Sequence, residues 1–290
     1  MIAAIDPWQW RPHPEVWLLL AGIVGLGFYA TRVIAPKING EVTQRQRRYF
    51  VLGVVTLAIA ADWPMHDIAE EYLYSVHMLQ HLLITFFIPI FFLQATPEWL
   101  ARLILGSGEQ DRTWVGRLAK PITAGIIFNA LAALTHWNGI VQLSADSGPF
   151  HYAIHLVMFA SALLMWLPVL GPLPELRLSP PGQMIYLFLM SIIPTVPAGW
   201  LTFADTVVYP AYDTTDRLWG ISVVHDQQAA GAVMKILGGF FLWVLIGIRF
   251  FNWAGSERRA DRERRVIRPL TFDDVEAEFE RSEPAMMEAP

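Results

Sequence analysis

The chain has 290 residues, of which 54% are hydrophobic and only 16% are charged. Soluble globular domains carry about 25% charged residues, and here the apolar residues form long blocks, so we expect a polytopic protein of the lipid bilayer with no nucleic-acid partner. The absence of cysteine excludes disulfides, iron–sulfur clusters and thiolate metal sites. Any metal must therefore bind to histidine, methionine, carboxylate or backbone groups.

Seven apolar stretches approach the ~20 residues that cross a bilayer core as a helix. The predicted fold is therefore all-α, a bundle of seven transmembrane helices over residues 1–254. The expected spans are Glu15–Ala35, Tyr49–Trp63, Tyr74–Thr96, Ile122–Ile140, His151–Leu170, Met184–Phe203 and His225–Trp253. Prolines at 89, 194 and 197 predict kinks in the third and sixth spans, which neighbouring helices can compensate.

The loops between these spans differ strongly in charge. Eighteen of the 21 Lys and Arg residues lie on one side, two lie on the other, and Lys235 falls inside the seventh span. Because loops rich in Lys and Arg stay in the cytoplasm, we predict an outer N-terminus and a cytoplasmic C-terminus. Residues 255–290 form a charged tail, predicted to be disordered.

Two pairs of histidines occupy the outer ends of two predicted spans. His77 and His81 open the third span, and His151 and His155 open the fifth. Residues four apart share one face of a helix, so the four imidazoles converge on one site if these spans are neighbours. Imidazole is a common ligand of copper and zinc, and these four residues are therefore the predicted metal ligands.

Several residues near the same level are candidates to support this site. Met78 offers a thioether, which suits Cu(I), although packing is the commoner role of methionine. Gln80 and Asp226 are candidates to orient a ring, with N-capping of the seventh span as the alternative for Asp226. The other candidates are His66, His136 and His225. An acidic segment would attract cations to this side of the membrane; it contains Asp62, Asp67, Glu70 and Glu71.

Lys235 lies near the middle of the seventh span, where an ionised side chain must face protein or water. One interpretation is a cavity position without a specific role. The other is a residue that lines an ion path or binds a partner.

Two segments resemble the multi-spanning CtaG family. Residues 77–83, His-Met-Leu-Gln-His-Leu-Leu, resemble its His-Met-x-Gln-His-Leu-Leu signature, and residues 226–231 resemble the Asp-Gln-Gln-x-x-Gly segment that opens its last helix. The second segment adds Gln227 to the supporting candidates, whereas Lys235 and the long tail depart from the family pattern. The resemblance covers roughly Glu15 to Asn252. It implies a cytochrome c oxidase assembly factor of the bacterial plasma membrane, with oxidase subunits or other assembly factors as partners.

The leading hypothesis is a binding protein, not an enzyme, that holds or delivers copper, with zinc as the other candidate ion. A haem- or quinone-dependent membrane redox enzyme is one alternative, but axial haem ligands approach from opposite sides of the ring. A metal-ion transporter is another, and it requires polar groups that continue across the bilayer.

Overall fold

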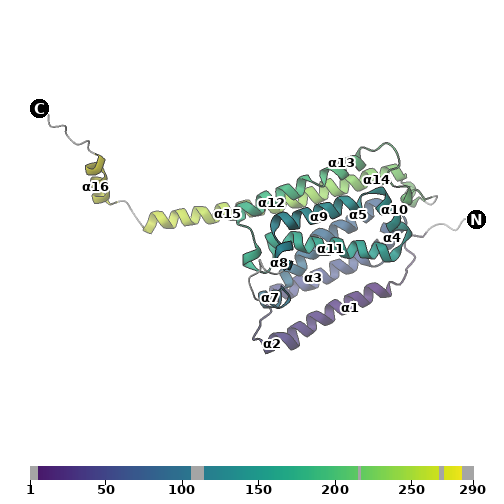
Figure 1. The fold of residues 1–290 in the computed structure, drawn as a ribbon, viewed down its shortest axis with the longest axis horizontal. Coiled ribbons are helices and arrows are strands. Elements are labelled where there is room, and N and C mark those ends of the chain that lie inside the picture. Colours follow the sequence, from purple (N-terminus) through teal and green to yellow (C-terminus); the bar gives the residue numbers. More distant parts are fainter. Residues whose placement is uncertain (1–5, 106–113, 215–216, 268–270, 283–290) are drawn as a thin grey trace, which may run out of the picture.

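The computed structural model describes residues 6–105, 114–214, 217–267 and 271–282, and every regular element within them is a helix (Figure 1). The predicted all-α fold is therefore confirmed. Six segments are long and apolar enough to cross a membrane, and a bent pair of shorter helices gives a seventh candidate. The six segments are Pro14–Lys37, Gln44–Glu71, Tyr74–Ala95, Gly148–Leu170, Pro180–Thr202 and Val223–Arg264.

The first part of the chain supplies three spans and two short helices. Its α-helices are α1 (Pro14–Tyr29), α2 (Ala35–Lys37), α3 (Gln44–Ala61), α4 (Met65–Glu71), α5 (Tyr74–Leu82), α6 (Ile88–Ala95), α7 (Glu98–Leu105) and α8 (Trp114–Leu118). Short π-helical segments, Ala30–Ile34 and Leu83–Phe87, join α1 to α2 and α5 to α6. The first and third spans are therefore each one continuous helical path.

The second part supplies the remaining spans and the tail. Its α-helices are α9 (Pro121–Thr135), α10 (Asn138–Asp146), α11 (Gly148–Leu170), α12 (Pro180–Ile192), α13 (Thr195–Thr202), α14 (Val223–Ala232), α15 (Gly239–Ile267) and α16 (Phe272–Ser282). A π-helical segment, Val233–Gly238, joins α14 to α15. Single 3₁₀ turns lie at Pro174–Leu176, Pro210–Tyr212 and Leu218–Gly220.

The second span begins earlier than expected, at Gln44 instead of Tyr49. Thr43 and Gln46 form a capping box: the Gln46 backbone N–H donates to the Thr43 hydroxyl at 3.2 Å, and the Thr43 N–H donates to the Gln46 side-chain oxygen at 2.9 Å. Such a box satisfies two free amides of the first turn, so the helix starts at polar residues ahead of the apolar run.

The expected fourth span, Ile122–Ile140, is wrong as a single helix. The chain breaks after Thr135, and α9 and α10 meet at 72°. The His136 ring bonds back to the Ala132 carbonyl at 2.6 Å, and the Tyr209 hydroxyl donates to the His136 carbonyl at 2.8 Å. These contacts hold the two residues between the helices in a turn, so α10 folds across the end of the bundle.

The third span contains Pro89, as predicted, and a neighbouring helix compensates for it. Proline has no N–H, so the carbonyl of Thr85, four residues earlier, lacks its α-helical donor. The indole N–H of buried Trp166 on α11 donates to this carbonyl at 2.9 Å. The π-helical segment Leu83–Phe87 lies at the same place, which is a common accommodation of such breaks.

The sixth span breaks at Pro194, between α12 and α13, and Lys235 lies opposite the break. Its ammonium group donates to the Thr195 hydroxyl at 2.6 Å and to the Ser191 carbonyl at 3.5 Å. Within the described residues no carboxylate pairs with Lys235, whose side chain is exposed. The lysine therefore satisfies polar groups freed by the break, while an ion path or partner at this position stays a prediction.

The third and fifth spans are neighbours, as the histidine pattern required. α11 packs against α6 and the π-helical segment on one side, and against α9 and α10 on the other. The largest core cluster lies at these contacts and includes Phe86, Trp166 and Leu242. α1 stands at the edge of the bundle in Figure 1 and has one buried side chain, Val16.

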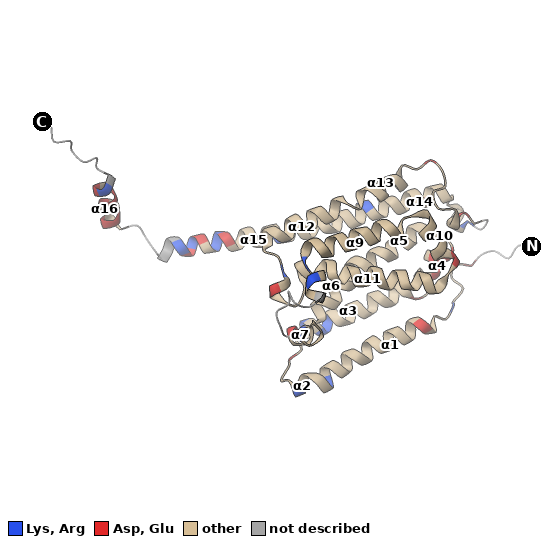
Figure 2. Ribbon diagram, viewed as in Figure 1, with Lys and Arg blue, Asp and Glu red and all other residues tan. Residues whose placement is uncertain are grey.

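Charge is distributed unevenly along the bundle. In Figure 2 the acidic residues of α4 lie at the end that faces the N-terminus, whereas blue residues gather at the opposite end, near α2, and on the extension of α15. The tail, expected to be unstructured, contains the end of α15 and exposed helix α16. Residues 268–270 and 283–290 of the tail lie outside the described residues. The membrane orientation and the division into domain and tail stay predictions.

Replacing Trp166 with Phe should destabilise the protein, because it leaves the buried Thr85 carbonyl without this donor. The expected loss is about 1–3 kcal/mol, the cost of a buried unsatisfied group, measured as the free energy of unfolding in detergent. The control is Trp243→Phe, since Trp243 is 54% exposed. Equal effects of the two substitutions would contradict this role of the indole N–H.

Candidate metal centre

The four predicted ligands come together between α5 and α11, and we call His77, His81, His151 and His155 the histidine cluster. Ring centroids of His77 and His81 are 4.5 Å apart, and those of His151 and His155 are 4.2 Å apart. Across the two helices, His81 lies 4.8 Å and His77 5.6 Å from His155. The predicted convergence of the two pairs is therefore observed, while metal binding itself stays a prediction.

Three of these rings are placed to share one ion. A ligand nitrogen from each of His77, His151 and His155 lies within 4.8 Å of the others. His81 instead contacts its neighbour, Nε2 to Nε2 of His77 at 2.9 Å. Because metal–nitrogen bonds are about 2.0–2.1 Å long, small side-chain rotations would bring the three nitrogens onto one ion.

Ring nitrogens of two cluster histidines have no hydrogen-bond partner among the described residues. Nδ1 of His77 and Nε2 of His155 are buried, and no described residue forms a hydrogen bond with either. An unpaired buried polar atom is costly, commonly by about 1–3 kcal/mol. A donor set of neutral imidazoles with free lone pairs therefore fits copper or zinc.

A cavity of about 60 Å³ lies against the cluster, where α5, α9, α10 and α11 meet. Its wall includes the four rings, Met78, His136 and Glu70. A water molecule occupies about 30 Å³ in the liquid, so this cavity has room for an ion with a water molecule. α10, which the bend after Thr135 places across the bundle, closes one side of the cavity with Ile140, Val141 and Ser144.

Glu70 of α4 provides a carboxylate next to the imidazoles. Its Oε1 contacts Nε2 of His151 and lies 3.6 Å from Nδ1 of His66. A negative charge beside neutral imidazoles favours a bound cation. Glu70 belongs to the acidic segment noted in the sequence, but its contact with the cluster depends on the turn between α4 and α5 and was not predicted.

Two contacts orient the cluster rings from outside. The Ser144 hydroxyl on α10 lies 2.9 Å from Nδ1 of His151, so Nε2 is the ring nitrogen that meets Glu70 at the cavity. Tyr74 stacks on His77, with centroids 5.7 Å apart and an interplanar angle of 17°. Such outer contacts fix the orientation of metal-binding rings. The i,i+3 spacing of Tyr74 and His77 could have suggested the second contact, whereas no sequence signal links Ser144 to His151.

Two further tyrosines, from the loop between α13 and α14, pack against Tyr74, and one of them, Tyr212, lines the cavity. Tyr209 and Tyr212 lie 4.9 and 4.8 Å from Tyr74, and Tyr212 lies 6.2 Å from His77. Burial raises the pKa of Tyr209 to about 12 and that of Tyr212 well above its ordinary value. Both hydroxyls are therefore neutral at pH 7, and that of Tyr209 donates to the His136 carbonyl.

Asp226 supports the site in a way that the sequence did not indicate. It neither touches a ring nor caps its own helix, whose N-cap is Ser222. Instead, its carboxylate accepts hydrogen bonds from the backbone N–H groups of Tyr74 and Ser75 at 2.7 and 3.0 Å and from the Ser75 hydroxyl at 2.6 Å. Asp226 thus caps α5, the helix that carries His77, from a distant part of the chain.

The other supporting candidates have separate roles. Gln80 is fully buried and joins α5 to α3, through a 2.7 Å bond to the Ala60 carbonyl and a 3.2 Å contact with His66. Gln227 forms hydrogen bonds with the backbone of Val208 and Tyr209, in the loop before α14. Both residues therefore hold elements around the cluster without contacting its rings.

The remaining histidines divide into near and distant positions. His136 lines the cavity and has a buried Nε2 with no partner among the described residues. The ring of His66 lies 6.5 Å from that of His151. His225 is exposed and does not line the cavity, so the structure separates it from the cluster.

The fold and the site define a class: polytopic all-helical proteins with a buried histidine cluster at one end of the bundle. Residues 26–256 match the family described as "Cytochrome c oxidase caa3 assembly factor (Caa3_CtaG)". The chain belongs to this family, and the resemblance noted in the sequence is confirmed.

Similar curated proteins add no established activity. Two uncharacterized proteins, from Mycobacterium bovis and Mycobacterium tuberculosis, are each 27% identical over 225 residues. These matches cover 71% of this chain but 34% of each relative, so the chain spans about a third of the length of the curated relatives it matches. No solved structure matches the chain.

Replacing Asp226 with Asn should destabilise the protein by about 1–2 kcal/mol, because both carboxylate oxygens accept hydrogen bonds from α5 and the amide NH₂ group cannot accept. Thermal unfolding in detergent measures the loss. Asp205→Asn, at an exposed carboxylate in the preceding loop, is the matched control. An unchanged melting temperature for Asp226→Asn would show that the cap does not stabilise α5.

Proposed function

We propose that this chain assists the assembly of cytochrome c oxidase in a bacterial plasma membrane by holding copper at the histidine cluster. Family membership supports the oxidase part of this proposal. The observation that carries the metal part is the convergence of the two histidine pairs, with buried and unpartnered nitrogens, on one small cavity. In this proposal copper is the cargo and the chain is its carrier.

Copper is favoured over zinc by one further donor. Imidazole suits both ions, and the chain has no cysteine that would favour a structural zinc site. The buried thioether of Met78 lines the same cavity, and thioethers suit Cu(I). Zinc remains the competing ion in the experiment below.

The size of the cavity favours a small ion over an organic cofactor. Sites for organic ligands usually enclose about 300–1,000 Å³. The cavity at the cluster has about 60 Å³, several times less than haem or a quinone would need. This supports a binding protein rather than a redox enzyme built around such a cofactor at this site.

The residues beneath the cluster favour holding over transport. Towards the middle of the bundle the buried side chains are mainly apolar and include Ile84, Phe86 and Trp166. An ion path would need polar groups through this layer. The cluster is therefore better suited to exchange its ion at one end of the bundle, with oxidase subunits or other assembly factors as partners.

Metal content after loading tests this proposal. Detergent-purified protein loaded with Cu(I), Cu(II) or zinc should retain about one copper ion per chain, because the cluster offers ligands for a single ion. A His77→Ala/His81→Ala double variant should lose that copper, since it removes half of the rings. Mass spectrometry of the separated protein measures both.

The matched control is His225→Ala, which removes an exposed histidine outside the cavity and should retain copper. Equal retention by wild type and the double variant would remove the cluster as the binding site. Retention of zinc alone would overturn copper as the cargo.

Labelling of single cysteines tests the orientation on which delivery depends. The chain has no cysteine, so Asp205→Cys, just after α13, and Ser256→Cys, on α15, each introduce one exposed thiol. The loop after α13 and the extension of α15 lie at opposite ends of the bundle in Figure 1. Because basic loops stay in the cytoplasm, a membrane-impermeant maleimide should label the first variant in intact cells and the second only after permeabilisation. The reverse pattern would place the histidine cluster on the cytoplasmic side.

A further inference from the structure

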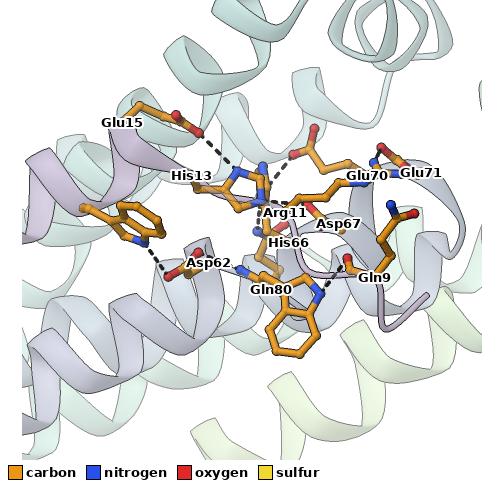
Figure 3. Close-up of polar contacts among 12 residues, drawn as sticks. Gln9, Arg11, His13, Glu15, Asp62, His66, Asp67, Glu70, Glu71 and Gln80 are labelled. Carbon is orange, nitrogen blue, oxygen red and sulfur yellow. Dashed lines mark hydrogen bonds and ion pairs between the residues drawn. The ribbon is translucent and has the colours of Figure 1, made fainter. Parts of the chain in front are cut away.

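A second group of polar side chains lies beside the histidine cluster, where the N-terminal segment crosses α4 (Figure 3). Arg11 pairs with Glu71, and the indole N–H of Trp63 donates to the Gln9 carbonyl at 3.1 Å. The N–H of Trp17 in turn donates to Asp62 at 3.0 Å. We call residues 9–17 the N-terminal strap, because these contacts hold it against the acidic segment.

His13 is the centre of the strap. Its Nε2 lies 2.8 Å from Oδ1 of Asp67, and its Nδ1 lies 3.2 Å from Oε1 of Glu15. The Asp67 side chain is 9% exposed, and its Oδ2 is buried without a partner among the described residues. A buried carboxylate oxygen and an imidazole thus stand together beside the ring of His66, which meets His13 edge-on with centroids 5.0 Å apart.

Glu70 connects His66 to the histidine cluster. Oε1 of Glu70 lies 3.6 Å from His66 and contacts His151, so one carboxylate reaches both rings. The Tyr152 hydroxyl also lies 3.4 Å from His66 and 3.2 Å from Glu15. The groups from Glu15 to His151 therefore lie in series, joined between His13 and His66 by the edge-on contact of their rings.

Exposure falls from Glu15 along the imidazoles of this series, while the two carboxylates between them, Asp67 and Glu70, are 9% and 27% exposed. The side chain of Glu15 is 48% exposed, that of His13 13%, that of His66 8% and that of His151 6%. Metal–nitrogen and metal–oxygen bonds are about 2.0–2.2 Å long, so one ion can bind two atoms up to about 4.4 Å apart. The separations of 2.8 Å at His13 and 3.6 Å at Glu70 lie within this limit.

We propose that Glu15, His13, Asp67, His66 and Glu70 form an access route by which copper moves from solvent to the histidine cluster through ligand exchange. The proposal rests on the proposed copper function of the cluster. The ion exchanges one ligand for the next, and no electron is transferred. Among the described residues, three ligand atoms come within 4.8 Å of one another only at His77, His151 and His155, so the route passes the ion and the cluster retains it.

The rate of copper loading, measured separately from the amount of copper bound at the end, tests the route. Cu(I) is presented as its complex with a chromophoric chelator, whose absorbance falls as the protein takes the ion. His13→Ala and Asp67→Asn should slow loading by about tenfold, the low end of the effect of charged clefts on association rates, without changing the copper bound at the end.

The control variant is Arg11→Ala, which removes the ion pair with Glu71 and loosens the strap without removing a route ligand. It should load at the wild-type rate. If Arg11→Ala slows loading as much as His13→Ala does, the strap acts through structure alone and the route is wrong.

The remaining outcomes are separable. If His13→Ala and Asp67→Asn both load copper at the wild-type rate, the access route is wrong, while the proposed function of the cluster is unaffected. A lower end point in His13→Ala, with its melting temperature unchanged, places His13 in the retaining site and also overturns the route. A wild-type protein that takes no copper overturns the proposed function itself.

Discussion

The burial of four imidazoles in an apolar helical bundle is the constraint on which the rest of this structure depends. Polar atoms removed from water need partners, and within a bilayer they have few. Here the cluster nitrogens face one another and a small cavity, and the surrounding helices hold them there. Asp226 caps α5, Ser144 orients His151, and Gln80 joins α5 to α3. A bound ion would satisfy the nitrogens that the protein leaves free.

The same requirement explains the irregular helices around the site. The third span contains Pro89 and a π-helical segment, and Trp166 satisfies the carbonyl exposed by the proline. The sixth span breaks at Pro194, where Lys235 donates to the freed groups. At both of these breaks a side chain from another helix donates to the freed backbone groups. Membrane helices can depart from regular hydrogen bonding only where neighbouring helices supply such replacement bonds.

Ligand type changes with depth at the histidine end of the bundle. Carboxylates dominate at the surface, at Glu15 and Glu71, and histidines mix with carboxylates at His13 and His66. Imidazoles predominate at the deepest position, with Glu70 as the one carboxylate among the described residues that lines the cavity. Carboxylates attract cations in water, whereas buried neutral imidazoles bind late transition metals selectively. This order supports capture at the surface and retention below it, with an apolar layer that stops further passage.

Sequence alone determined the helical class, most of the spans and the two histidine pairs, because apolar length and i,i+4 spacing are local properties of the chain. Tertiary structure decided that the two pairs face each other and that the predicted fourth span bends after Thr135. It also assigned Asp226 to α5 and Glu70 to the cluster. These features depend on contacts between segments as much as 152 residues apart. Local patterns carry no information about which distant backbone groups a side chain will meet, so only the packed bundle could reveal them.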